Sequence, residues 1–98
     1  MKSYRGMRTF DGREVTVDGQ ALDSRYDLKT FSRNGFEWGF EGREPRQLAL
    51  AILADAAGDG PALEQAEAFM HAIVANFDNE WEMTQAQVEE ALDALSRR

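Results

Sequence analysis

The chain contains no cysteine and only one histidine among its 98 residues. Disulfide bonds and thiolate metal sites are therefore excluded, and no second histidine is present to complete a zinc motif. A Cys–His nucleophile is also excluded, and none of the four serines lies in the Gly-x-Ser-x-Gly context of a nucleophile elbow. We therefore expect a protein that is not an enzyme and that uses no cofactor.

Long apolar segments are also missing. The longest apolar run, residues 48–54, is far shorter than the roughly 20 residues that span a bilayer. Residues 1–10 include basic side chains but no apolar stretch of the kind found in signal peptides. We expect a soluble, cytoplasmic protein without a membrane partner.

Basic residues are nearly absent from the second half of the chain, which gives the protein a formal net charge of −7. Residues 50–98 carry ten Asp or Glu against Arg97 and Arg98, whereas residues 1–49 carry eight Asp or Glu against nine Lys or Arg. Solubility is one explanation of such an excess, and recognition of a positively charged partner is another.

The first 22 residues have the pattern of antiparallel strands. Residues 3–10 and 13–17 each favour a strand, and Asp11-Gly12 between them is typical of a tight hairpin turn. In the second segment Val15 and Val17 alternate with polar residues, which predicts one buried and one exposed face. Asp18-Gly19 predicts another turn, before a short strand at residues 20–22.

Two more strands are predicted further along this half, at residues 30–32 and 36–40. Asn34-Gly35 between them is a third turn signal. In the second of these strands Phe36, Trp38 and Phe40 would share one face and pack on the helices.

The apolar spacing becomes helical after residue 43. Pro45 suits a helix start, and the wide apolar stripe that follows predicts the most buried helix of the chain. Gly58 favours its end, and Asp59 is expected to cap a second helix. The predicted inward stripe of that helix consists of Leu63, Ala66, Met70, Ile73, Val74 and Phe77, with Phe69 at its edge.

A third helix is predicted from a capping box formed by Thr84 and Gln87. Residues 78–82 just before it are interpreted as a loop. Together the patterns predict an α+β fold in which a small antiparallel sheet of three to five strands in the N-terminal half packs against three C-terminal helices. One domain would cover residues 1–98, mainly β over 1–42 and helical over 44–98.

The acidic second half supports the sharpest functional hypothesis. Carboxylates at fixed spacings can imitate a row of phosphates and occupy a basic groove, and opposite fields speed the encounter. Trp81 would serve as an interface anchor if exposed and as core if buried. We predict binding to a basic nucleic-acid-binding protein or complex through Asp78, Glu80, Trp81, Glu82, Glu89, Glu90 and Asp93.

Two alternatives belong to other classes of function. Arg5, Arg8 and Arg13 with neighbouring aromatic residues could bind single-stranded nucleic acid directly, although adjacent carboxylates cancel most of their charge. His71 and Glu67, one helical turn apart, could form half of the site of a small hydrolase or metal protein. A metal site would need further ligands, and the sequence predicts none.

The segment Gly35-Phe36-Glu37-Trp38-Gly39-Phe40, followed by Gly42, Pro45 and the run 47–55, resembles a family of small uncharacterised prokaryotic and phage-borne domains. The resemblance covers roughly residues 4–80. This chain departs from the family in having Gly42-Arg43-Glu44 where a Gly-Ser-Gly-like stretch usually precedes the proline. The family implies no catalytic activity, but it does imply a phage or mobile-element setting. By analogy, small acidic proteins from that setting include counter-defence factors such as anti-CRISPR inhibitors.

Overall fold

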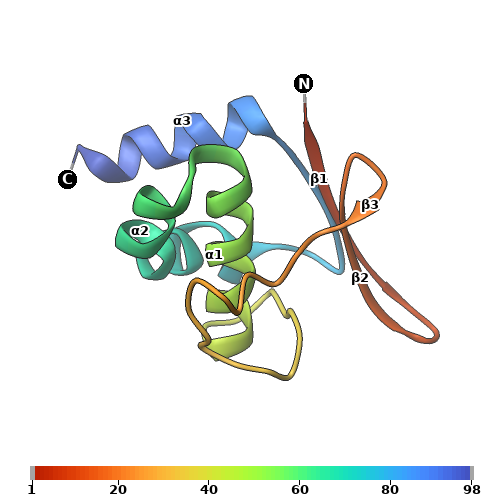
Figure 1. Ribbon diagram of the computed structural model, residues 1–98. Coiled ribbons are helices and arrows are strands. Elements are labelled where there is room, and N and C mark those ends of the chain that lie inside the picture. Colours follow the sequence, from red (N-terminus) through yellow and green to blue (C-terminus); the bar gives the residue numbers. More distant parts are fainter. Residues whose placement is uncertain (1, 98) are drawn as a thin grey trace.

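Four strands form one antiparallel sheet, and three α-helices pack against it (Figure 1). A computed structural model provides this arrangement and describes residues 2–97. The elements are β1 (Ser3–Thr9), β2 (Gly12–Val17), β3 (Gln20–Ala21), α1 (Arg43–Ala57), α2 (Asp59–Ala72), the 3-10 helix η1 (Val74–Asn76), β4 (Glu80–Thr84) and α3 (Gln85–Ser96). The strand order is β3-β2-β1-β4. The predicted α+β fold is confirmed.

Alternation along the strands gives the sheet one buried and one exposed face. Gly6 of β1 lies on the buried face, between Val15 of β2 and Trp81 of β4. Arg5 and Met7 lie on the opposite face and are exposed. Figure 1 shows all three helices on one side of the sheet, so the face that carries Arg5 has no helix over it.

Helix α1 forms the centre of the core. Every residue from Gln47 to Leu53 is fully buried, which confirms that this helix is the most buried one. It packs against α2, where Phe69 and Met70 are buried. Tyr4 from the sheet and Trp38 from the loop before α1 complete the core, and neither has any exposed surface. No helix in residues 2–97 is long and apolar enough to cross a membrane.

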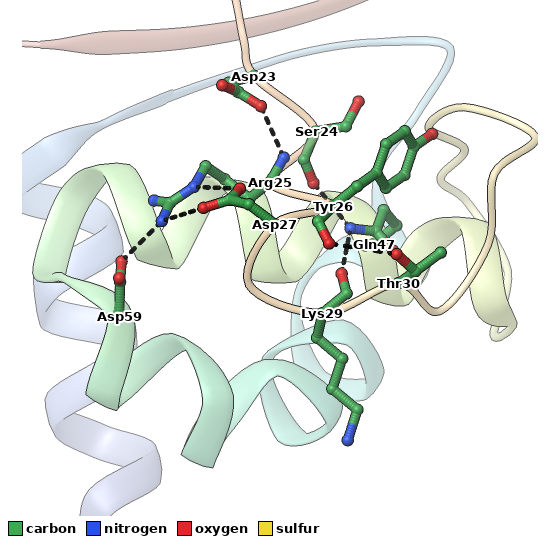
Figure 2. Close-up of polar contacts among 9 residues, drawn as sticks. All are labelled: Asp23, Ser24, Arg25, Tyr26, Asp27, Lys29, Thr30, Gln47 and Asp59. Carbon is green, nitrogen blue, oxygen red and sulfur yellow. Dashed lines mark hydrogen bonds and ion pairs between the residues drawn. The ribbon is translucent and has the colours of Figure 1, made fainter.

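A long loop, residues 22–42, joins β3 to α1, and the buried side chain of Gln47 holds its first half in place (Figure 2). The Gln47 amide donates to the carbonyl groups of Ser24 at 2.7 Å and Lys29 at 3.0 Å. Its oxygen accepts from the N–H groups of Phe31 and Ser32, at 2.7 and 3.3 Å. All four hydrogen-bonding positions of the amide are therefore used, as burial requires.

The strands predicted at 30–32 and 36–40 are not present, because this loop replaces them. Gly35 and Gly39 have φ angles of +87° and +86°, a region that strand residues do not adopt. Trp38 is fully buried whereas Phe40 is 46% exposed, so the aromatic residues do not share one buried face.

The fourth strand lies where the sequence predicted a loop, inside the half expected to be helical. Glu80, Trp81, Glu82 and Met83 alternate between solvent and core, and β4 pairs with β1. Glutamate is uncommon in strands, so Glu80 and Glu82 made the alternating pattern of β4 difficult to recognise in the sequence. The division into a β half and a helical half is thus wrong in detail.

The helix boundaries agree with the sequence at the first and third helices and differ at the second. Thr84 and Gln87 form the predicted capping box. Asp59 does not cap α2 with its side chain, because Gly58 takes the cap position and Asp59 pairs instead with Arg25 at 3.1 Å. The inward face of α2 is also rotated from the prediction, since Phe69 is fully buried and Leu63 is 48% exposed.

Candidate interaction surface

The residues predicted to contact a partner lie on β4 and α3, except for Asp78, which lies just before β4. We call Asp78, Glu80 and Glu82 the β4 group, and Glu89, Glu90 and Asp93 the α3 group. All six carboxylates are exposed. Figure 1 shows α3 running from the end of β4 away from the sheet, so the two groups spread over different parts of the surface.

Trp81, the seventh predicted contact, belongs to the core. Only 8% of its surface is exposed, because the alternation of β4 directs it to the helical side of the sheet. Its ring stacks on Phe77 with centroids 4.3 Å apart and meets Trp38 edge-on at 6.0 Å. The conditional prediction for Trp81 therefore resolves to core, and its indole is not an interface anchor.

The six carboxylates differ in how far they are already neutralised. Glu82 pairs with Arg5 at 3.3 Å, and Asp93 pairs with Arg97 at 2.7 Å. The other four form no ion pair with any residue of the segment 2–97; they are Asp78, Glu80, Glu89 and Glu90. Arg98, the second of the two cations near the end of the chain, lies outside the described residues.

Folding partly offsets the charge asymmetry of the sequence. Eight of the 18 carboxylates lie within 4 Å of a Lys, Arg or His nitrogen of residues 2–97, and ten do not. Among the Lys and Arg residues of the segment 2–97, only Lys29, Arg33 and Arg43 have no carboxylate partner. The uncompensated charge of the described surface is therefore negative. Five of the pairs join the two halves: Lys2–Asp55, Arg5–Glu82, Arg25–Asp59, Arg46–Glu67 and His71–Glu41.

The exposed side of the sheet carries part of this negative charge around a hollow of about 440 Å³. In the register of the strands, Met7 stands between Glu14 of β2 and Glu80 of β4. Arg5, two residues before Met7 on β1, lies opposite Glu82 of β4. We call this side the outer face; its residues at the hollow are Arg5, Met7, Glu14, Thr16, Glu80 and Glu82.

A second hollow of about 560 Å³ adjoins the start of β4. Asp78 and Glu80 line it, together with the exposed ring of Phe40. Glu80 thus borders both hollows, whereas Asp78 and Glu82 border one each.

The arginines of the nucleic-acid alternative are engaged with carboxylates. Arg8 donates to Glu37 at 2.9 Å and lies over the Trp38 ring, and Arg13 pairs with the same carboxylate at 3.1 Å. Partial burial acts to raise the pKa of Glu37, but the hydrogen bond from Arg8, the N–H of Trp38 and both arginine charges outweigh it and lower that pKa. Arg5 is held by Glu82. Little of this positive charge is left for phosphate.

Tyr4 links strand β1 to helix α1. Its hydroxyl donates to Asp55 at 2.7 Å, and Lys2 contacts the same carboxylate at 3.2 Å. Burial raises the pKa of Tyr4 above its usual range, and the bond to Asp55 and the charges of Asp55, Asp18 and Glu89 raise it further. Tyr4 therefore stays protonated at neutral pH.

His71 lies between two carboxylates on the surface. Its Nδ1 is 2.8 Å from Glu41, and its Nε2 is 3.9 Å from Glu67, which Arg46 also contacts. Within residues 2–97 no group of three or more His, Cys, Asp or Glu is arranged to hold a metal ion. The contact with Glu41 was not predicted, because it comes from the loop 22–42.

Sequence reasoning missed the outer face as a unit. Glu14 was predicted on the face opposite Val15, and this exposed position is correct. Its pairing with Met7 is set by the β1–β2 hairpin, but the place of Glu80 on the other side of Met7 could not be predicted without β4.

Comparison with known proteins gives a family but no activity. The model of a family of unknown function, DUF6166, matches residues 4–94, which is nearly the whole chain. No curated protein and no solved structure matches the sequence.

Proposed function

The chain belongs to DUF6166, a family of unknown function, and we propose that it is a non-enzymatic interaction module that binds a positively charged surface of another protein. The observation that carries this proposal is the set of exposed carboxylates in the β4 group and the α3 group that have no ion-pair partner in residues 2–97. These are Asp78, Glu80, Glu89 and Glu90.

Electrostatics explain why such a surface would select a partner. A carboxylate already paired on the surface has part of its charge compensated, so an incoming cation must first displace the existing partner. An unpaired one keeps its full charge for an incoming Lys or Arg. Several such groups steer association and disfavour partners of the same sign.

The partner class follows from the same charge pattern. Proteins that hold nucleic acid carry grooves lined with Lys and Arg, spaced for phosphates. A protein whose carboxylates occupy such a groove would compete with the nucleic acid, so the module would act as an inhibitor. The anti-CRISPR role implied by the resemblance is a narrower form of this proposal, with a phage or mobile-element origin, and its support is analogy alone.

A binding measurement with two charge-matched variants tests the proposal. The probe is a fluorescently labelled 20-residue polylysine in buffer with 150 mM salt. The test variant combines Glu80→Gln, Glu89→Gln and Glu90→Gln. The control variant combines Asp11→Asn, Glu44→Gln and Glu64→Gln, three carboxylates elsewhere on the chain that also lack ion pairs in residues 2–97.

We expect the test variant to bind the probe at least about 10-fold more weakly than the unmodified protein, which is about 1.4 kcal/mol. The control variant has the same net charge and should lose less than about 3-fold. Equal losses in the two variants would show that only net charge matters and would contradict the proposal.

A further inference from the structure

The outer face of the sheet combines charge with an apolar centre. Met7 is 41% exposed at the middle of the face, although large apolar side chains in this chain are mostly buried. Its neighbours across the strands are Glu14 and Glu80, both exposed and without an ion pair in residues 2–97. A thioether flanked by two carboxylates complements the side chain of Lys or Arg, whose apolar stem ends in a cation.

The charge of this face decides which kind of molecule can cover it. Three glutamates stand around one arginine at the hollow: Glu14, Glu80, Glu82 and Arg5. A second copy of the chain would place like charges against each other, and nucleic acid would meet the same repulsion. A positively charged polypeptide is the complementary occupant.

The spacing of the carboxylates indicates the shape of that polypeptide. Glu80 and Glu82 lie two residues apart on one strand, which places their Cα atoms about 6.6–6.8 Å apart. An extended peptide repeats its side chains on one face at the same interval. A lysine or arginine at every second position would therefore meet successive carboxylates along β4.

We propose that the outer face binds an extended segment of the partner that has Lys or Arg at every second position, with its stems over Met7 and its cations at Glu14, Glu80 and Glu82. This inference rests on the proposed function and adds the site and the partner's local structure. It also assigns a role to Arg5, which pairs with Glu82 at 3.3 Å. Both side chains of that pair are more than half exposed, so an incoming cation can replace Arg5 at little cost.

Two peptides of identical composition test the predicted shape. One alternates lysine and threonine over nine residues, and the other has the same five lysines in one block followed by four threonines. Binding is measured by fluorescence anisotropy at 150 mM salt with the full chain. We expect the alternating peptide to bind at least about 5-fold more tightly than the block peptide.

Three variants test the predicted site. Glu14→Gln with Glu80→Gln should weaken binding of the alternating peptide at least about 10-fold. Glu89→Gln with Glu90→Gln on α3 removes the same charge from the other part of the acidic surface and should weaken binding of this short peptide less than the sheet variant does. Arg5→Gln should strengthen binding several-fold, because it frees Glu82. All are exposed positions, and circular dichroism checks that each variant folds.

The outcomes separate this inference from the proposed function. Loss of binding in the α3 variant but not in the sheet variant would overturn the outer face as the site and leave the acidic module intact. Equal affinity for the two peptides would overturn the extended geometry. Weaker binding by the Arg5→Gln variant would overturn the role of Glu82. A chain that binds polylysine but neither short peptide would also overturn the inference, whereas failure to bind polylysine would overturn the proposed function itself.

Discussion

Glu37 ties three separate segments of the chain together through a single carboxylate. Arg8 of β1 and Arg13 of β2 both contact it, and the N–H of Trp38 donates to it at 3.3 Å. Arg8 also donates to the carbonyl group of Trp38 and to the side chain of Asn79, just before β4. The motif around Trp38 is therefore explained by packing, as the join between the long loop, the β1–β2 hairpin and the start of β4.

The lowered pKa of Glu37 predicts a dependence of stability on pH. A carboxylate with a lowered pKa in the folded state stabilises the fold above its ordinary pKa of about 4.3, and this contribution is lost as the pH falls through the folded value. Glu37→Gln should therefore cost about 1–2 kcal/mol of unfolding free energy at pH 7 and much less at pH 3. Urea denaturation at both pH values measures the difference.

Glu64→Gln is the control for this prediction. Glu64 is exposed on α2 and forms no ion pair within the described residues, so its replacement should change stability by less than about 0.5 kcal/mol at either pH. If Glu37→Gln costs the same at pH 3 as at pH 7, the ionised pairing of Glu37 does not contribute to the fold.

At the scale of elements, β4 connects the helical part of the chain back to the sheet, and its position depends on one glycine. A Cβ atom on Gly6 would lie 2.2 Å from the indole nitrogen of Trp81 and 2.3 Å from a ring carbon. Real Cβ contacts are essentially never that short, so the Trp81 ring would have to shift and would disturb its stacking on Phe77. The absence of a side chain at Gly6 therefore admits Trp81 into the core and β4 beside β1.

Gly6→Ala should lower the unfolding free energy by about 2 kcal/mol or more, because the Trp81 ring must shift. Gly60→Ala is the matched control. Gly60 lies in the first turn of α2 with no atom within 4 Å of a Cβ and no positive φ angle, so alanine should stabilise the protein by roughly 0.5 kcal/mol. Thermal unfolding followed by tryptophan fluorescence measures both. A neutral effect of Gly6→Ala would show that β4 can adjust its distance from β1.

Several elements could be predicted from sequence because their signals are local. The hairpin β1–β2 follows from alternation and the Asp11-Gly12 signal, but its turn is one residue earlier, at Phe10 and Asp11, since Gly12 already pairs with Thr9. Helix α3 follows from the pair Thr84 and Gln87. The conformation of the loop 22–42 could not be predicted, because it depends on hydrogen bonds from Gln47. Gln47 comes later in the chain, in a helix whose pattern is mostly apolar. Aromatic alternation at 36–40 suggested a strand, yet the positive φ angles of Gly35 and Gly39 prevent one.

At the scale of the whole molecule, the functional surface could be predicted only in part. The charge excess is visible in the sequence, and the exposure of the carboxylates at positions 78, 80, 82, 89, 90 and 93 agrees with it. Which of them keep a free charge depends on pairs between distant positions, such as Arg5–Glu82. The outer face depends on the return of β4 to β1, a long-range pairing that no local pattern indicates.

The central claim is that a positively charged segment is held by the carboxylates that β2 and β4 present on the outer face. The most direct measurement is a titration of ¹⁵N-labelled protein with the alternating lysine–threonine peptide, followed by amide chemical shifts. We expect the largest changes at Met7, Glu14, Glu80 and Glu82, with small changes in α1 and α2. Changes concentrated in the loop 22–42 or in α2, or none at saturating peptide, would contradict the claim.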